Sequence, residues 1–408
     1  MYRPRVLETR LLGSVSRNKV RFLFGARQTG KSSLLRHALP RERTRVYDLA
    51  DASLRLRFEA DPAALSREIR ALPKAIENVV LDEIQKVPAL LDEIQTLHDA
   101  APRARQYFLT GSSARRLRAR ATNLLPGRSH TTHIHPVCAW EFAQAAALAI
   151  GAPRGWAPPP GGFPRPRLER LLQLGSLPGI LAEPRATAAA TLETYAQVYL
   201  EEEIRREALV REIGPFVVFL RLAATEAGGQ INLRKLSQES GVPASTLSTY
   251  YEVLVDTFIG TFVEAYAHRS RKRLLTTPRF LFFDVGVRNG AAGRSLDARI
   301  SGDDGGRLLE QWVGQELIAR ASYLGRPHRV SFWRTTTGAE VDYVWESARE
   351  DIPIEVKWTE RPRPEDARHL ETFLDEHPKR SRRGLVVCRC AAPQQLTDRV
   401  TAIGWDRL

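Results

Sequence analysis

The sequence predicts an α/β protein of several domains, the first of which contains a parallel β-sheet. The apolar run Val20 to Phe24 is followed by GARQTGKS, Gly25 to Ser32, in which two glycines precede a lysine and a hydroxyl residue. A second apolar run ends in Asp82 and Glu83, and a third ends near Thr110. Buried strands with polar residues at their carboxyl ends are typical of parallel sheets, which bind ligands at that edge.

Length and composition indicate an ordinary globular chain. The 408 residues are 43% hydrophobic and 26% charged, which suggests about two to three hydrophobic cores. The net charge of +14 favours polyanionic partners, nucleic acid first, although arginines spread over a solvated surface are the alternative.

The sequence contains no membrane or disulfide signature. No apolar run approaches the roughly 18 to 20 residues of a membrane span, and Met1–Arg10 lacks a signal-peptide core, so we expect a cytoplasmic protein without membrane contact. Cys138, Cys388 and Cys390 are too few for a disulfide framework or a four-thiolate zinc site. We interpret them as small buried hydrophobes.

The glycine-rich segment predicts a phosphate-binding loop for ATP. Two glycines let backbone N–H groups face a polyphosphate, and the following helix adds its positive N-terminal end. Lys31 is expected to reach the β- and γ-phosphates, and the Ser32 hydroxyl to bind Mg²⁺. The expected nucleotide-binding residues of this segment are Gly25, Gln28, Thr29, Gly30, Lys31, Ser32 and Ser33.

The next two apolar runs supply further candidate residues. Asp82 is expected to hold the Mg²⁺ shell, and Glu83 to orient or deprotonate the attacking water. Thr110 or Ser112 would hydrogen-bond the γ-phosphate or that water. The alternative for these hydroxyls is a helix N-cap before Ala114, and both roles are compatible. Between the runs we expect a strand within Arg43–Asp51 and helices over Ser53–Leu72 and Ala89–Ala100.

This order of loop, acidic strand end and polar strand end resembles the AAA+ ATPases. NLLPGRSH, Asn123 to His130, and QLGSLPGIL, Gln173 to Leu181, are similar to a large bacterial and archaeal family that joins an AAA+ module to a C-terminal domain of unknown function 4143. The resemblance covers nearly the whole chain. It implies that Arg128 is an arginine finger or γ-phosphate sensor and that the protein forms homo-oligomers; a solvated surface arginine is the alternative.

We expect an ATPase module over residues 1–150, followed by three further parts. Residues 151–219 form a Pro- and Gly-rich connection and a helical region, 220–275 a winged helix-turn-helix, and 276–408 a C-terminal α/β domain. We do not expect a metal at His130, His133 and His135, because no nearby carboxylate or thiol completes a ligand set.

The expected helix-turn-helix lies in Gly229–Gly260. Two helical patterns flank ESGVP, and a cluster of basic residues follows as a β-wing would. This arrangement suits contact with nucleic acid, DNA rather than RNA, whereas a domain that mediates only protein contacts is the alternative. The expected phosphate-contacting residues are Arg269, Arg271, Lys272 and Arg273.

The C-terminal region contains a possible second catalytic site. A strand bearing Asp342 precedes one bearing Glu355 and Lys357, whose side chains share a face about 6 to 7 Å apart. With a preceding helix that bears Glu310, this pattern resembles the PD-(D/E)XK nuclease superfamily, a restriction-endonuclease-like fold. The resemblance implies Mg²⁺ or Mn²⁺ at Glu310, Asp342 and Glu355, and Lys357 as a catalytic residue.

This second resemblance leaves several choices open. Glu316 competes with Glu310, Glu340 is a further or substitute ligand, and the strand lacks a proline before Asp342. Two functions therefore follow from the sequence. One is an ATPase that binds nucleic acid and cleaves it; the other is an ATP-dependent switch or DNA-binding motor with a catalytically inactive C-terminal domain.

Overall fold

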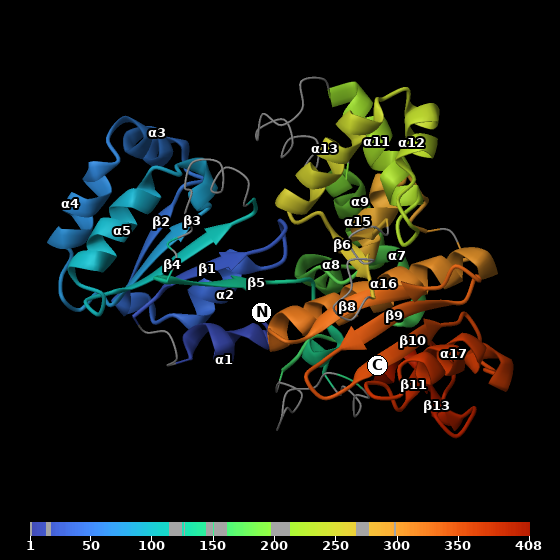
Figure 1. Ribbon diagram of the computed structural model, residues 1–408. Helices are drawn as coiled ribbons and strands as arrows, with labels where there is room; N and C mark the ends of the chain where they lie inside the picture. The colour runs from blue at the N-terminus through green and yellow to red at the C-terminus, as the bar shows by residue number, and fades with distance from the viewer. Residues whose placement is uncertain are drawn as a thin grey trace. The chain divides into compact units, whose positions relative to one another are not determined.

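The computed structural model describes residues 2–13, 18–113, 125, 127–143, 150, 161–196, 213–266, 277–297 and 299–408. These residues form two compact units (Figure 1). The first comprises Met1–His135 with Asp256–Phe258, and the second comprises Pro136–Val255 with Ile259–Leu408. Each unit contains its own large β-sheet.

The first unit contains a five-stranded parallel sheet. Its strands are β1 (Val20–Phe24), β2 (Thr44–Asp48), β3 (Asn78–Asp82), β4 (Gln106–Gly111) and β5 (Ser129–His133). The strand order is β2-β3-β4-β1-β5, and all neighbours are parallel. Strands β1 and β3 are buried along their whole length, as expected for parallel strands covered by helices on both faces.

Helices cover both faces of this sheet. They are α1 (Leu7–Leu12), α2 (Lys31–Ala38), α3 (Ala52–Ala60), α4 (Ala63–Ala71) and α5 (Leu90–Ala100), with short 3-10 helices η2 (Arg41–Arg43) and η3 (Ile84–Lys86). Figure 1 shows α1 and α2 on one side of the sheet and α4 and α5 on the other. The helical region expected over Ser53–Leu72 consists of two helices, α3 and α4, because the chain turns at Asp61 and Pro62, which lie between them.

The register of the sheet aligns the ends of three strands. Leu23 of β1 pairs with Thr110 of β4, and Leu81 of β3 pairs with Leu109. Strand β4 therefore lies between the loop that follows β1 and the acids at the end of β3. The predicted phosphate loop and acidic strand end thus share one edge of the sheet.

The second unit contains an eight-stranded mixed sheet. Its strands are β6 (Gly260–Ala265), β7 (Arg279–Phe282), β8 (Arg329–Arg334), β9 (Glu340–Glu346), β10 (Asp351–Val356), β11 (Gly384–Cys388), β12 (Gln394–Gln395) and β13 (Val400–Gly404). They follow the order β12-β13-β11-β10-β9-β8-β6-β7. Strands β8, β9 and β10 are antiparallel neighbours, whereas β10, β11 and β13 are parallel.

The helices of the second unit pack in two groups. They are α7 (Leu168–Leu174), α8 (Pro178–Ala182), α9 (Arg185–Thr194), α11 (Ile213–Thr225), α12 (Leu233–Ser240), α13 (Ala244–Asp256), α15 (Val285–Ala291), α16 (Gly302–Leu324) and α17 (Arg368–Glu376), with η4 (Ala139–Glu141), η6 (Pro364–Ala367) and η7 (Trp405–Arg407). Helices α8, α9, α11, α12, α13 and α15 share an apolar core with β7. Helix α16 packs on one face of the sheet and α17 on the other.

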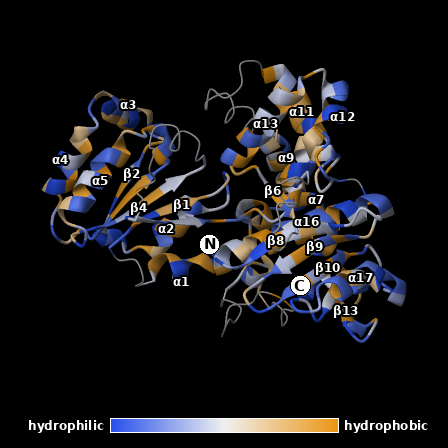
Figure 2. Ribbon diagram, viewed as in Figure 1, coloured by the Kyte–Doolittle hydropathy of each residue, from blue (hydrophilic) through white to orange (hydrophobic). Residues whose placement is uncertain are grey.

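Hydropathy follows this architecture. Figure 2 shows hydrophobic residues along several strands, and both hydrophobic and hydrophilic residues on the helices. Cys138, Cys388 and Cys390 are buried and are not joined in disulfides. None of the helices in the described ranges is long and apolar enough to cross a lipid bilayer.

The structure groups the middle of the chain differently from the expected division. The boundaries expected at 219/220 and 275/276 fall inside the second compact unit. The second of them lies between β6 and β7, which pair with each other and belong to the same sheet as the C-terminal strands. Strand pairing across the expected boundary is the physical reason for the difference. Most of the Pro- and Gly-rich connection, residues 151–160, lies outside the described ranges.

Candidate functional site

The loop between β1 and α2 has the backbone shape that its glycines allow. A Cβ atom on Gly25 would lie 2.4 Å from the carbonyl oxygen of Ile134 and 2.9 Å from its Cγ2. Gly30 has φ of 95°, in the region that favours glycine, and Gln28 adopts a φ of 62°. The two glycines are therefore required by a close approach at one end of the loop and by a left-handed turn at the other.

Buried polar groups brace this loop. Lys31 is 5% exposed, and its Nζ donates to the carbonyl oxygens of Gly25 and Ala26 at 2.9 and 3.0 Å. The Thr29 hydroxyl donates to the Ala26 carbonyl at 2.8 Å. Arg5 donates to the Thr29 carbonyl at 2.7 Å. The ammonium group thus lies against the loop that is expected to hold phosphates.

Hydrogen bonds from β4 fix the acidic pair at the end of β3. The Thr110 hydroxyl donates to Oδ1 of Asp82 and accepts from the backbone N–H of Glu83 at 3.1 Å. Glu83 has φ of 61° and ψ of 46°, a left-handed conformation that costs energy for a residue with a Cβ and often occurs at functional sites. The strand thus ends abruptly with both acids held in place.

The Glu83 carboxylate is held by two donors. Its Oε2 accepts from Nε2 of Gln85 at 2.5 Å and from the Ser112 hydroxyl at 2.9 Å. Burial acts to raise the pKa of Glu83, but the Lys31 charge and the two hydrogen bonds outweigh it, so the pKa lies below its ordinary value. Glu83 is therefore ionised at neutral pH.

The two hydroxyls expected to contact phosphate or water both contact these acids. Thr110 bonds Asp82, and Ser112 bonds Glu83. The helix N-cap that was the alternative role precedes Ala114, which lies outside the described residues.

A cavity adjoins the loop and the acidic strand end. Its volume is about 380 Å³, and Ser32 and Asp82 line it together with Leu35, Arg36, Leu39, Arg41, Thr44, Val46 and Val80. A hydroxyl and a carboxylate that face one space are the oxygen ligands that Mg²⁺ prefers. The residues present therefore fit the expected Mg²⁺.

Two other residues of the predicted nucleotide-binding set, Gln28 and Ser33, are exposed.

Arg128 lies at the amino ends of the strands, whereas the loop lies at their carboxyl ends. It immediately precedes β5, and its carbonyl accepts from the N–H of Val20, the first residue of β1. The five residues of β1 separate these amino ends from the loop by about 16 Å. Its Nε donates to Asp99 at 2.5 Å, and its side chain is 42% exposed. This position favours a finger role toward a neighbouring subunit over a γ-phosphate sensor role within its own subunit, and both roles stay predictions.

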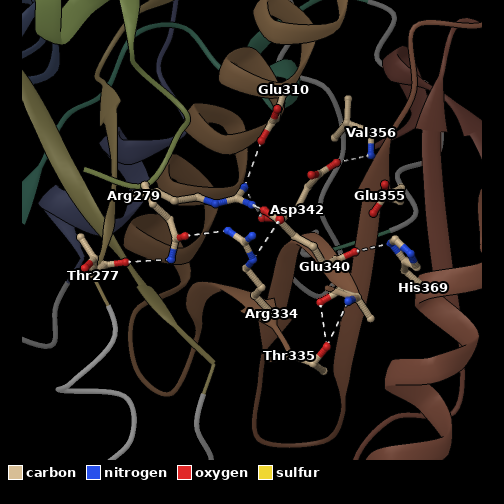
Figure 3. A network of polar contacts seen from close by, with 12 residues as sticks. Thr277, Arg279, Glu310, Arg334, Thr335, Glu340, Asp342, Glu355, Val356 and His369 are labelled. Carbon is tan, nitrogen blue, oxygen red and sulfur yellow. Dashed lines mark hydrogen bonds and ion pairs between the residues drawn. The ribbon is translucent and has the colours of Figure 1, made fainter. Parts of the chain in front are cut away.

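The second unit brings together four carboxylates. Glu310 comes from α16, Glu340 and Asp342 from β9, and Glu355 from β10 (Figure 3). Oδ2 of Asp342 accepts from the backbone N–H of Val356 at 2.8 Å, which links β9 to β10. The sequence pattern thus places the expected acids in one cluster.

Glu355 has one bonded and one unbonded carboxylate oxygen. Lys357 Nζ donates to Oε1 of Glu355 at 2.7 Å. The other oxygen, Oε2, is buried without a hydrogen-bond partner among the described residues. Such an oxygen is costly to bury unless a proton or a cation accompanies it.

Burial and mutual repulsion raise the pKa values of the clustered acids. Burial and the Asp342 charge raise the pKa of Glu310 to about 8. The same two causes raise the pKa of Glu355 to about 8 against the opposing charge of Lys357. Burial also raises the pKa of Asp342, although Arg279 opposes it.

Arg279 enters this cluster from β7. Its side chain is 4% exposed. The guanidinium donates to Oε1 of Glu310 at 3.0 Å, to Oε1 of Glu340, and to the Asp342 carbonyl at 3.2 Å (Figure 3). Within the described ranges, no three or more His, Cys, Asp or Glu side chains are arranged to hold a metal ion. Glu310, which was expected to join Asp342 and Glu355 around one metal, is thus hydrogen-bonded to a guanidinium through Oε1, and its role as a metal ligand stays a prediction.

The competing helical acid has a structural role. Glu316 is 2% exposed and bonds Nε of Arg320 at 2.7 Å. It also accepts from the backbone N–H of Ala139 at 3.0 Å. Glu316 therefore fixes η4 against α16 and does not belong to the carboxylate cluster.

The expected helix-turn-helix segment consists of α12, a turn and α13. Gly241 ends α12 with φ of 70°, and the antiparallel pair β6 and β7 follows α13. The exposed positions of α13 carry small, hydroxyl and acidic side chains, namely Ala244, Ser245, Ser248, Thr249 and Glu252. The basic residues Arg269, Arg271, Lys272 and Arg273 lie outside the described ranges.

Sequence reasoning missed Arg5, Gln85 and Arg279. Gln85 lies two positions after Glu83, and a polar side chain so close to a predicted catalytic acid was a usable signal. Arg279 opens the apolar run RFLF, where a buried guanidinium requires a counter-ion. Nothing local in the sequence marks Arg5, whose partners Thr29 and His135 are distant in the chain.

Three sequence families match the chain in succession. Residues 17–143 match an AAA domain, residues 165–298 match a domain of unknown function 8612, and residues 305–408 match a domain of unknown function 4143. The first match contains the phosphate loop and the acidic strand end, and the last contains the clustered carboxylates.

Individual proteins are similar over most of the chain. An uncharacterized protein of Mycobacterium tuberculosis is 22% identical over 353 residues, which is 86% of this chain and 73% of that protein. An uncharacterized protein of Haemophilus influenzae is 22% identical over 379 residues, 88% of each chain. Among solved structures, a Walker-type ATPase of Pyrococcus abyssi aligns with a TM-score of 0.46 and 16% identity over 71% of this chain and 96% of that one. The chain is thus similar to an AAA domain in its N-terminal part and to the domain of unknown function 4143 in its C-terminal part.

Proposed function

We propose that the first unit binds and hydrolyses ATP with Mg²⁺. The observation that carries this proposal is the convergence of the Gly25–Lys31 loop, Asp82 and Glu83 at one edge of a parallel sheet. The match of residues 17–143 to an AAA domain supports it independently.

Each residue of this edge has a separate task in the proposed reaction. The loop N–H groups and the N-terminus of α2 bind the phosphates, and Lys31 exchanges its bonds to the loop carbonyls for phosphate oxygens. When bound by Ser32 and Asp82, Mg²⁺ neutralises charge on the phosphates. The ionised Glu83 orients the attacking water and accepts its proton.

The test of this proposal is the substitution Lys31→Ala. We expect it to abolish ATP hydrolysis and to weaken nucleotide binding, measured by phosphate release and by a fluorescent ATP analogue. Lys19→Ala is the matched control, because Lys19 precedes the same strand at its other end. Normal turnover by Lys31→Ala would refute the proposal.

We further propose that the protein acts as a homo-oligomer in which Arg128 reaches the ATP of a neighbouring subunit. The support is its position at the edge of the sheet away from its own loop, together with its exposed side chain. An arginine there would neutralise charge that develops on the transferred phosphoryl group.

A second candidate function is metal-dependent cleavage of nucleic acid by the nuclease-like acids Asp342 and Glu355 with Lys357. The specific observation in its favour is the buried Oε2 of Glu355, which lacks a hydrogen-bond partner in the described part of the chain. Asp342 and Glu355 would hold Mg²⁺ or Mn²⁺, and Lys357 would stabilise negative charge on the phosphate.

Cleavage of labelled DNA and RNA with Mg²⁺ or Mn²⁺ tests this second function. Metal-dependent products that both Glu355→Ala and Lys357→Ala abolish, with ATPase retained, would support it. No cleavage of any substrate would favour the alternative function, an ATP-dependent switch or DNA-binding motor with an inactive nuclease-like domain.

We also propose that nucleic acid, DNA rather than RNA, is the partner of the second unit. The support is the order α12, turn, α13, β6 and β7, as in a winged helix. Binding by phosphate contacts should weaken steeply with salt. Binding that does not depend on salt would contradict this proposal.

A further inference from the structure

The guanidinium of Arg279 is held rigidly at the carboxylate cluster. The backbone of Arg279 pairs with Val263 of β6 and forms a bridge with Gln230 on its other side. Its guanidinium carbon lies 4.8 Å from the centre of the Phe332 ring. A residue fixed by two strand partners and an aromatic ring has little freedom to leave the cluster.

This guanidinium is shared between two acids. Its Nη1 donates to Oε1 of Glu310, and its Nη2 donates to Oε1 of Glu340 (Figure 3). Helix α16 is fixed at this point, because the Tyr343 hydroxyl donates to the Glu310 carbonyl at 3.0 Å. Glu310 and Glu340 therefore face a cation that is part of the protein.

The remaining acids of the cluster have other partners. Asp342 accepts from the N–H of Val356, and Glu355 accepts from Lys357. Arg279 bonds Asp342 only through its carbonyl oxygen. The cluster thus has an Arg279 side, with Glu310 and Glu340, and a Lys357 side, with Asp342 and Glu355.

We propose that Arg279 is a built-in cation that occupies the Glu310 side of the cluster and excludes a divalent metal ion from that side. Arginine remains charged at all physiological pH values, so it repels a second cation there permanently. Metal binding at the Asp342 side is a separate matter, and this inference holds whether or not that side cleaves nucleic acid.

Counting bound Mn²⁺ ions on the full chain without nucleotide tests the proposal. Removing the guanidinium in Arg279→Ala frees the carboxylates of Glu310 and Glu340 for a metal. We expect this variant to bind one more Mn²⁺ per chain than the unmodified protein, with an affinity for that ion raised by at least about tenfold. The additional Glu310→Gln substitution should remove this extra ion. Electron paramagnetic resonance of free Mn²⁺ and calorimetry measure both quantities.

Arg334→Ala is the matched control. Arg334 also lies near Glu340, with Nε 3.7 Å from Oε2, but its side chain is 48% exposed. Its removal should leave the number of bound ions unchanged. An extra ion in Arg334→Ala as well would show that general loss of positive charge, and not the place of Arg279, governs metal binding, and would overturn the proposal.

Two other outcomes would also overturn it. One is a folded Arg279→Ala chain that gains no ion. The other is loss of a Mn²⁺ ion from the otherwise unmodified protein on Glu310→Gln alone, because Glu310 would then bind metal in the presence of Arg279. This second measurement decides the matter even if Arg279→Ala does not fold. The proposed nuclease is tested separately, by whether substitution of Asp342 removes a bound Mn²⁺ ion.

Discussion

Replacement of Glu83 by glutamine should separate ATP binding from ATP hydrolysis. Glutamine has the shape of glutamate and keeps one carbonyl oxygen that can accept from Gln85 and Ser112. The backbone N–H of residue 83 keeps its bond to Thr110. The substitution therefore removes the proton acceptor and its charge while the surrounding hydrogen bonds largely remain.

The size of the expected effect follows from that difference. Loss of a general base lowers kcat by about 10²- to 10⁴-fold, which corresponds to about 2.7 to 5.4 kcal/mol in the activation free energy. Nucleotide affinity should stay the same or increase, because a negative charge near the phosphates is removed. Since the pKa of Glu83 lies below its ordinary value, Glu83 stays ionised between about pH 6 and 8. Its ionisation should therefore cause no change in the rate of the unmodified enzyme over this pH range.

Single-turnover phosphate release and binding of a fluorescent ATP analogue measure these two effects. Glu77→Gln is the matched control, because Glu77 precedes the same strand at its other end and its side chain is 58% exposed. Turnover at the unmodified rate by Glu83→Gln would refute the assignment of Glu83. Loss of nucleotide binding together with turnover would show that Glu83 acts in binding.

Three further predictions follow from the geometry. Arg128→Ala should retain nucleotide binding, but its rate of ATP hydrolysis should fall by about 10³-fold. Mixing this variant with Lys31→Ala subunits should restore part of the activity. No restoration would contradict action between subunits. Gly175→Ala should destabilise the fold by more than about 2 kcal/mol, because Gly175 has φ of 71° and a Cβ would lie 2.0 Å from Oδ1 of Asp284. Gly179→Ala is the control, because nothing lies within 4 Å of a Cβ at that position. Equal thermal unfolding of both variants would refute the steric argument. Burial raises the pKa of Asp284 from 3.8 to about 6, so the folded state binds the proton more tightly than the unfolded state, and the contribution of this group to stability should increase as pH falls from about 7 to 4. The difference in unfolding free energy between the unmodified protein and Asp284→Asn should show this trend, and a difference that does not vary with pH would contradict it.

Local sequence patterns predicted the phosphate loop and the acidic strand end. The glycines, Lys31 and Ser32 lie within one turn and the start of one helix, so their relative positions depend on few residues. The side-chain contacts of Thr110 and Ser112 could not be predicted in the same way. They depend on β4 lying beside β3, and strand order is a property of the whole sheet.

The C-terminal cluster illustrates the same limit. Alternation along β10 indicated that Glu355 and Lys357 would share a face, and the resemblance to the PD-(D/E)XK nucleases implied that Asp342 would lie beside them. Arg279 reaches Glu310 and Glu340 from β7, which is 31 and 61 positions away in the chain. A single sequence contains no pattern that pairs residues at such separations, so the cation of the cluster became visible only with the fold.

The continuous eight-stranded sheet affects how the chain can be divided or inherited. Strands β6 and β7 lie in the stretch matched by one domain of unknown function, and β8 to β13 lie in the stretch matched by the other. Gene fragments cut between the two matches would separate β8 from its partner β6 and leave an exposed strand edge, which favours aggregation. Recombination between related genes should therefore preserve these two stretches as a pair, even though their sequences are recognised as separate families.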